Sequence, residues 1–283
     1  MAILIGLIPA LAWGLLPISI AKTGGKPANQ ILGTTAGTLI IALALLVFTR
    51  HVISARTFIL SFLSGALWVV GQLGQYQAYT RLGVSGTMPV STGLQLTGTS
   101  LIGVFVFGEW PGIQEKLIGF SALAIVIIGI YLTSLKRKTP VSKVDKKSLL
   151  ILVLTTLGYL AYSSIPKITD RAGTAIFFPQ ALGMFIAANI YILFSRQTPV
   201  YRAAVSWKNM LSGVLFSIGA LAYILSAHLN GIATGFVLSQ LCVVVSTIGG
   251  IVILREQKTR VELAAAGIGL GLIILGSAAT AFL

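Results

Sequence analysis

The feature that most constrains this chain is a series of ten apolar stretches, each about as long as a membrane helix. A helix needs roughly 20 mostly apolar residues to cross the hydrocarbon core of a bilayer. The stretches that meet this requirement are Ile3–Ala21, Gln30–Thr49, Thr57–Thr80, Val84–Gly108, Ile113–Leu135, Ser148–Lys167, Thr174–Ser195, Asn209–Ala227, Ile232–Leu254 and Glu262–Leu283. The sequence therefore predicts an all-α membrane protein with ten transmembrane helices.

The composition also favours a membrane protein. Only 9% of the residues are charged, whereas a soluble domain carries about 25%. So few charges cannot cover a surface that faces water, and we expect most of the surface to face a lipid bilayer. The excess of 20 Lys and Arg over 6 Asp and Glu would suggest nucleic acid in a soluble protein. Here the basic residues lie between apolar stretches, so we expect no nucleic-acid partner.

The distribution of Lys and Arg predicts the orientation of the chain. The connectors after odd-numbered stretches hold 15 of the 20 basic residues, and those after even-numbered stretches hold 5. Cytoplasmic loops are the ones enriched in Lys and Arg. The longest connector, residues 136–147, is strongly basic and belongs to the richer side. We therefore expect a cytoplasmic linker at 136–147 and both termini outside the cell.

The segments before and after this linker resemble each other. At an offset of 148, Ser64-Gly65 matches Ser212-Gly213. Other matches keep the same order along the chain: Pro17 with Pro166, Gly71 with Gly219, Gly83 with Gly231, Ser91 with Ser239 and Glu109 with Glu256. We expect two five-helix repeats, 1–135 and 148–283. Because five is odd, the second repeat would be inverted in the membrane, an arrangement that suits alternating access.

The third stretch carries the densest group of polar side chains. Gln72, Gln75, Tyr76 and Tyr79 follow the spacing i, i+3, i+4, i+7 and share one helix face, and Trp68 lies one turn earlier. Amides can donate to and accept from sugar hydroxyls, and an aromatic ring can pack on the apolar C–H face of a pyranose. The pattern favours a sugar-binding surface. Hydrogen bonding between helices is the alternative.

The fourth and ninth stretches add further polar candidates. Ser91, Thr92 and Gln95 lie in a run that is too polar to face lipid throughout. Ser239 and Gln240 stand near the equivalent positions of the ninth stretch. We expect Gln95 and Gln240 to approach the centre from opposite repeats. Packing between helices is the alternative for this group as well.

Three prolines interrupt predicted spans. Pro17 and Pro166 occupy matched positions in the first and sixth stretches, and Pro89 lies in the fourth. Proline removes a backbone hydrogen bond and bends a helix, so these positions are candidates for gating. A tolerated kink without a gating role is the alternative. Trp13, one turn before Pro17, is a further candidate for binding substrate.

The acidic residues lie outside the predicted span centres. They are Glu109, Glu115, Asp145, Asp170, Glu256 and Glu262. Carriers of protons or cationic drugs place a carboxylate inside the membrane, so this pattern argues against a multidrug-cation exporter. Glu109 is the remaining candidate for a proton-coupling site, and capping of the following helix is the alternative role for it.

Nothing in the sequence predicts an enzyme. No hydrolase, kinase or nucleotide-binding motif is present, so we expect neither catalytic residues nor a cofactor. His51 and His228 lie far apart near span ends, and Cys242, the single cysteine, lies in an apolar stretch. These residues predict no metal site and exclude an intramolecular disulfide.

Short motifs spread over almost the whole chain resemble one known family. They are NQILGTT at 29–35, SGALW at 64–68, GQ at 71–72, GTMPVSTGLQL at 86–96, FGEW at 107–110, LSQL at 238–241 and VSTIGG at 245–250. Together they resemble the glucose/ribose porter family of Gram-positive bacteria, in the drug/metabolite transporter superfamily. The resemblance implies ten spans in two inverted halves, sugar uptake linked to protons, and Gln72, Ser91, Gln95 and Gln240 at motif positions.

We therefore expect a secondary transporter of the bacterial plasma membrane that imports a monosaccharide, glucose or ribose, by alternating access. Proton coupling and the oligomeric state are left open. One alternative is an exporter of a small amphipathic metabolite such as an amino acid. Another is a membrane scaffold or sensor that transports nothing and would need no polar cavity.

Overall fold

The computed structural model describes residues 2–49, 51–108, 110–135, 146–169, 171, 173–230 and 238–281. These residues form helices and their connectors. The α-helices are α1 (Ala2–Thr23), α2 (Pro27–Thr49), α3 (Ala55–Leu82), α4 (Val84–Val106), α5 (Ile113–Ser134), α6 (Lys146–Ser164), α7 (Thr174–Phe194), α8 (Ala204–Lys208), α9 (Met210–Asn230), α11 (Cys242–Val252) and α12 (Arg260–Ala281). Two short 3-10 helices, η1 (Ile165–Ile168) and η2 (Thr198–Arg202), adjoin α6 and α8.

Ten helices occupy the positions of the ten predicted spans, and α8 is an additional short helix. Eight of the spans are long and apolar enough to cross a membrane. The fourth span, α4, has 23 residues and is long enough, but its Ser, Thr and Gln side chains make it too polar to be counted among these eight. The ninth is described only as the shorter apolar helical stretch Leu238–Val252. The prediction of an all-helical membrane protein with multiple spans is confirmed.

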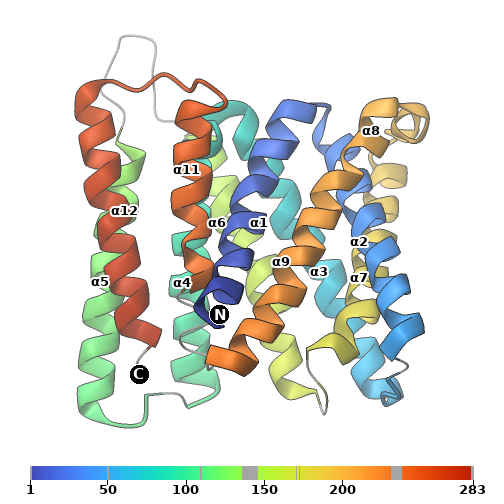
Figure 1. Cartoon of the computed structure of the whole chain (residues 1–283), viewed down its shortest axis with the longest axis horizontal. Coiled ribbons are helices and arrows are strands. Elements are labelled where there is room, and N and C mark those ends of the chain that lie inside the picture. The colour runs from blue at the N-terminus through green and yellow to red at the C-terminus, as the bar shows by residue number, and fades with distance from the viewer. Residues whose placement is uncertain are drawn as a thin grey trace.

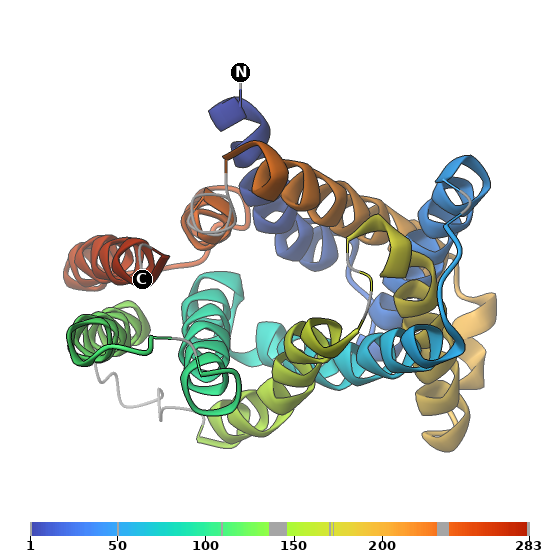
Figure 2. The same ribbon diagram turned by 90° about the horizontal axis from the view of Figure 1, so that it is seen from below.

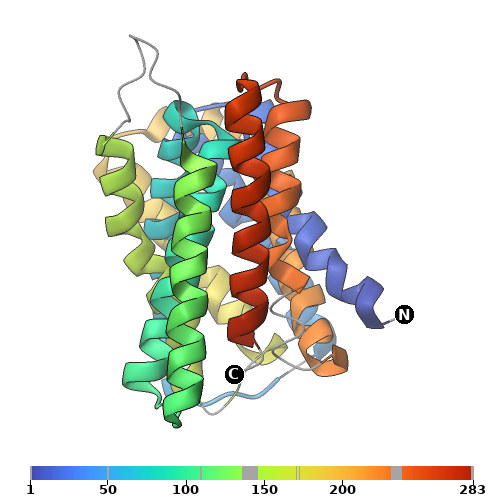
Figure 3. The ribbon, with the colours of Figure 1, turned by 90° about the vertical axis from the view of Figure 1, so that its left-hand side faces the viewer.

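The helices run between two edges of the molecule (Figure 1). We call one the linker edge: α5 ends there and α6 begins there. We call the other the terminal edge: α1 begins there and α12 ends there (Figures 1 and 3). Seen from below, α5 and α12 lie side by side at one flank of the bundle (Figure 2).

The helices before and after residues 136–147 are interleaved rather than segregated. Helix α1 packs against α9 and α11, and α2 packs against α9. In the same way, α6 packs against α3 and α4, and α7 packs against α3. Helices α2 and α7, α4 and α11, and α5 and α12 also contact each other in pairs. Each of these pairings joins an early helix to a late one.

Glycines allow these helices to approach closely. A Cβ on Gly65 of α3 would overlap the backbone carbonyl of Gln180 on α7, and one on Gly183 would overlap that of Phe62. Small residues at such positions bring helix backbones together in membranes, where lipid provides no hydrophobic driving force. The α3–α7 crossing therefore depends on glycine in both helices.

The crossing of α2 and α9 has the same construction. A Cβ on Gly213 of α9 would overlap the carbonyl of Thr34 on α2, and one on Gly37 would overlap that of Met210. Gly213 follows Gly65 by 148 residues, the offset at which the two sequence segments match. Two crossings in different parts of the chain thus use glycines at matched positions.

Candidate functional site

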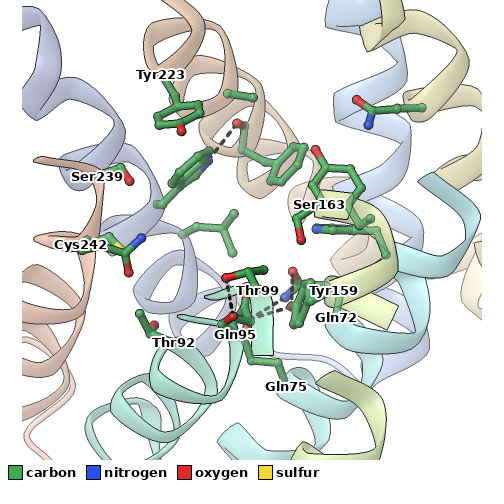
Figure 4. A pocket seen from close by; sticks show the side chains of 18 of the residues that line it. Gln72, Gln75, Thr92, Gln95, Thr99, Tyr159, Ser163, Tyr223, Ser239 and Cys242 are labelled. Carbon is green, nitrogen blue, oxygen red and sulfur yellow. Dashed lines mark hydrogen bonds between the residues drawn. The ribbon is translucent and has the colours of Figure 1, made fainter. Parts of the chain in front are cut away.

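A cavity of about 440 Å³ lies between two groups of helices. One side comes from α3, α4, α6 and α7, and we call it the polar wall. The other comes from α1, α9 and the α11 region, and we call it the aromatic wall. Ligand sites typically occupy about 300–1,000 Å³, so the space suits a small molecule. Figure 4 shows side chains of both walls around it.

A chain of hydrogen bonds orders the polar wall. The Gln72 amide donates to Gln75 Oε1 (3.0 Å), and the Gln75 amide donates to Ser91 Oγ (2.9 Å). The Gln95 amide also donates to Ser91 Oγ (3.2 Å). From α6, the Tyr159 hydroxyl lies 2.9 Å from Gln72 Oε1 and 3.2 Å from Gln75 Oε1. The chain fixes the orientation of the amides before a ligand arrives, and Figure 4 shows the part of it around Gln72, Gln75 and Tyr159.

Gln180 extends the polar wall along α7. Its amide donates to Ser64 Oγ (3.1 Å), whose hydroxyl donates to the backbone carbonyl of Tyr162 (2.9 Å). Thr92 and Thr99 of α4 also line the cavity. Polar side chains at membrane depth are costly when exposed to lipid. Here they face one another and the cavity.

The aromatic wall is built around Trp13. Its ring lies 5.9 Å from that of Tyr223, and its Nε1 donates to the Phe216 carbonyl (3.2 Å). Gly219 lies beneath it, where a Cβ would overlap the indole. Helix α9 therefore positions Trp13 in two ways. It accepts one hydrogen bond from the indole, and Gly219 leaves the space that the ring occupies.

Trp68 is more deeply enclosed than Trp13. It contributes to the cavity lining, but only 2% of its surface is exposed. Its ring lies 4.9 Å from Phe216 and 6.4 Å from Tyr159, the latter edge to face. Most of the ring is enclosed by protein, whereas Trp13 is only partly buried.

Several polar groups of the cavity are not engaged by other side chains. Among the described residues, none forms a hydrogen bond with the Gln240 amide, the Thr92 hydroxyl, the Tyr162 hydroxyl or the Tyr223 hydroxyl. A polar group without a partner costs free energy when water is excluded. These groups are therefore available to a ligand with several hydroxyls.

The described lining carries no Asp, Glu, Lys, Arg or His. A charged ligand buried here would lack an opposite charge, and isolated charges are expensive to bury. Likewise, no group of three His, Cys, Asp or Glu residues that could hold a metal ion occurs in the described ranges. The chemistry of the lining suits a neutral polar molecule with apolar faces.

Judged from the described residues, the cavity opens toward the terminal edge and is closed toward the linker edge. Its lining reaches Pro166 in η1 and Gly173 at the start of α7, and the lining residue Ser163 is exposed. In the opposite direction it stops at Met88, one turn after the buried Val84 at the start of α4. Within the described part of the chain, the accessible end of the cavity is therefore the one at the terminal edge.

Most residues expected at a site do line the cavity. They are Trp13, Pro17, Trp68, Gln72, Gln75, Tyr79, Thr92, Gln95, Pro166, Ser239 and Gln240. Ser91 lies behind the lining and holds two amides. Tyr76 is fully buried, and its hydroxyl lies 2.8 Å from that of Thr34 on α2. Pro89 is buried within α4 outside the lining. Glu109 lies outside the described residues.

Sequence reasoning missed several lining residues. They are Thr99, Tyr159, Tyr162, Gln180, Phe216 and Tyr223. One signal was available, because Tyr162 matches Trp13 between the sixth and first stretches. Tyr159 lies three residues earlier on the same helix. Its contact with Gln72 depends on how α6 packs on α3, which the sequence pattern alone does not reveal.

Comparison with known proteins identifies the family. Residues 4–283 match the family described as sugar transport protein. A protein of Latilactobacillus sakei named for ribose uptake, RbsU, is 46% identical over 99% of this chain and 98% of its own. A protein of Listeria monocytogenes named for sugar uptake is 45% identical over 98% and 97%. RbsU of Staphylococcus epidermidis is 43% identical over 100% and 98%.

A solved crystal structure shares the fold. It is 16% identical in sequence, covers 100% of this chain and 98% of its own, and has a TM-score of 0.60. The full-length match, the similar relatives and the multi-span helical architecture agree. This chain belongs to the sugar transport protein family, and it is a multi-pass membrane transporter rather than an enzyme.

Proposed function

We propose that this protein imports a neutral monosaccharide, with ribose as the first candidate and glucose as the second, by alternating access. The observation that carries the proposal is the composition of the cavity. A preorganised chain of amides faces a partly exposed aromatic pair, and the described lining has no charged side chain. Ribose comes first because RbsU relatives are named for its uptake.

The two walls suit the two kinds of surface on a sugar. Hydroxyls can pair with Gln95 and Gln240 and with the chain through Gln72 and Gln75. The C–H face can pack on Trp13, with Tyr223 beside it. Preorganised polar groups reduce the free energy spent on ordering the site when the sugar binds.

The same lining weighs against an amino-acid exporter. An amino acid carries an ammonium and a carboxylate, and each would need an opposite charge or dense hydrogen bonding in a site shielded from water. The described lining offers no ionised group for either. A scaffold or sensor would have no use for a polar cavity with one open end.

Alternating access is supported by the matched construction of the two repeats. The α3–α7 and α2–α9 crossings both use glycine in each helix, and Gly65 and Gly213 stand at the offset of 148 residues at which the two sequence segments match. Helix pairings also recur in exchanged form, since α1–α9 corresponds to α6–α3. Inverted repeats allow the two groups of helices to exchange conformations and so to open the site to the other side. Pro17 and Pro166, which both line the cavity, are the proposed bending points there, and Pro89 is the one in α4.

The orientation follows from the basic residues. Among the described residues, Lys and Arg are concentrated at the linker edge, for example Lys22, Lys26, Lys208 and Arg260. The positive-inside rule places this edge in the cytoplasm of a bacterial plasma membrane. The cavity, open toward the terminal edge, then faces the outside of the cell.

Counterflow in proteoliposomes tests the function. Purified protein is reconstituted in vesicles loaded with unlabelled ribose, glucose or a neutral amino acid, and entry of the same compound in labelled form is compared. We expect exchange of at least one sugar and none of the amino acid. Exchange of the amino acid without either sugar would favour the exporter, and exchange of nothing would favour the scaffold.

Proton coupling needs a separate comparison. An inward-directed proton gradient is imposed, and the net uptake of sugar is measured for Glu109→Gln and for Glu115→Gln. Glu115 is the matched control because it is an acid that caps its own helix. If Glu109 couples protons, its variant loses the stimulation by the gradient and retains counterflow. If both variants respond like the parent protein, the carrier works without a proton at Glu109.

A further inference from the structure

The start of α4 is capped by a side chain from a distant part of the chain. Gly83 precedes the helix and offers no side chain to cap it. The carboxylate of Glu256, in the connector between α11 and α12, accepts hydrogen bonds from two backbone N–H groups instead. Its Oε1 lies 2.6 Å from Val84 N, and its Oε2 lies 3.0 Å from Ser85 N.

The hydrogen bonds between Glu256 and the start of α4 are expected to be strong, for two physical reasons. The first N–H groups of a helix have no partner within it, and the helix dipole favours a negative charge there. Hydrogen bonds to a carboxylate are about twice as strong as neutral ones. Within the described part of the chain, Glu256 has no ionic partner, so this helix end is the main counterpart of its charge.

Two glycines make room for the carboxylate. Gly83 has a φ of +74°, and a Cβ there would lie 2.7 Å from Glu256 Oε1. A Cβ on Gly250 would lie 2.9 Å from Ser85 N and 3.0 Å from Glu256 Oε2. The backbone N–H of Glu256 also donates to the Gly250 carbonyl (3.1 Å), which turns the connector back onto the end of α11. Glycines on both sides of the contact therefore leave space for the carboxylate.

The position of this contact relates it to transport. Helix α4 belongs to the polar wall, and Glu256 follows α11 of the aromatic wall. The contact lies at the linker edge, where the cavity is closed. Helices α4 and α11 contact each other, and Val84, Met88 and Val243 belong to the same buried hydrophobic cluster. A path to this edge cannot open unless the two walls separate here.

We propose that Glu256 is a latch that holds the two walls together at the linker edge and so stabilises the conformation open at the terminal edge. The proposal rests on the proposed alternating access. Each transport cycle breaks the hydrogen bonds to Val84 and Ser85 and forms them again. Weakening them shifts the carrier toward the conformation open at the linker edge.

Spin-label distances test the latch in the full-length protein. Labels are attached to cysteines that replace Lys22 and Thr80, exposed residues near the linker-edge ends of α1 and α3. Cys242 is replaced by Ala, and transport by this parent is measured first. We expect Glu256→Ala and Glu256→Gln to raise the ratio of long to short distances about tenfold, as loss of a charge-assisted hydrogen bond predicts.

A second variant leaves the carboxylate in place. Gly250→Ala inserts a methyl group against Ser85 N and Glu256 Oε2, so it should shift the ratio in the same direction. The matched controls are Glu115→Gln, which removes the charge of a cap within one helix, and Gly267→Ala, where a Cβ meets nothing within 4 Å. Both controls should keep the parent ratio.

The outcomes separate the latch from the function. If the parent exchanges ribose but Glu256→Ala and Gly250→Ala keep its distance distribution, the latch is wrong and the function stands. If no preparation, including the parent, exchanges a sugar, the proposed function fails. Thermal unfolding in detergent confirms that each variant is folded before its distances are interpreted.

Discussion

The polar wall and the aromatic wall face the same cavity but differ in how they are held. In the polar wall, each amide is fixed by another polar side chain, and the chain from Tyr159 to Gln95 crosses three helices. In the aromatic wall, Trp13 is held by one hydrogen bond to the backbone and by packing. A change in the polar wall therefore leaves several partners unsatisfied, whereas a change in the aromatic wall removes mainly contact area.

The largest effect is expected for Gln75→Ala. Gln75 accepts from Gln72 and Tyr159 and donates to Ser91, so its loss affects three neighbours as well as the sugar. We expect the affinity for ribose to be about 100-fold weaker. The affinity is measured by competition in the counterflow assay. Gln77→Ala is the control, because Gln77 is on the same helix outside the lining. Equal effects of the two would contradict the ordered polar wall.

A smaller effect is expected for Tyr159→Phe. The ring beside Trp68 remains, but the hydroxyl that fixes Gln72 and Gln75 is lost. We expect an affinity about tenfold weaker and a slightly lower melting temperature, because the buried Gln72 Oε1 loses its donor. Tyr131→Phe, on the exposed face of α5, is the control. An unchanged affinity would mean that the amides keep their orientation without Tyr159.

The aromatic wall should tolerate change better. Trp13→Phe keeps a ring but removes the Nε1 donor and part of the stacking surface beside Tyr223. Aromatic pairs contribute about 0.5–1.5 kcal/mol, so we expect an affinity about fivefold weaker. Trp110→Phe, outside the cavity lining, is the control for general effects of losing an indole. A loss as large as that of Gln75→Ala would remove the distinction between the walls.

The smallest effect on affinity is expected for Trp68→Phe. Because the ring is enclosed by Phe216 and Tyr159, the substitution should lower the melting temperature while changing ribose affinity less than about twofold. Affinity and thermal unfolding are measured on the same preparation. A large loss of affinity with unchanged stability would restore Trp68 as the surface on which the sugar stacks.

The sequence predicted the helices and much of the polar wall for clear physical reasons. Apolar stretches of span length define membrane helices, and the spacing of Gln72 and Gln75 places them on one face. Tyr76 belongs to the same pattern, yet its hydroxyl pairs with Thr34. A polar stripe is wide enough for one edge to meet a neighbouring helix while the other meets a cavity.

The rest of the site required the packing of distant helices. Tyr159 and Tyr223 look like ordinary aromatics within apolar stretches, and only the placement of α6 on α3 and of α9 on α1 gives them a role. The sequence also placed Glu256 in a connector, where an acid is unremarkable. Its contact with Val84 joins positions 172 residues apart, beyond what local pattern indicates.

The interleaving of early and late helices has a consequence for biogenesis. Gln72 and Gln75 enter the membrane on α3 before the ribosome has made α6, which carries Tyr159. Until α6 and α7 arrive, the amide face of α3 and the bare backbone at Gly65 lack their final neighbours. The first segment therefore stays in the bilayer without its final helix contacts until the later helices are inserted. When segments 1–135 and 148–283 are expressed separately, we expect each to be degraded rapidly, and we expect co-expression to slow the degradation of both.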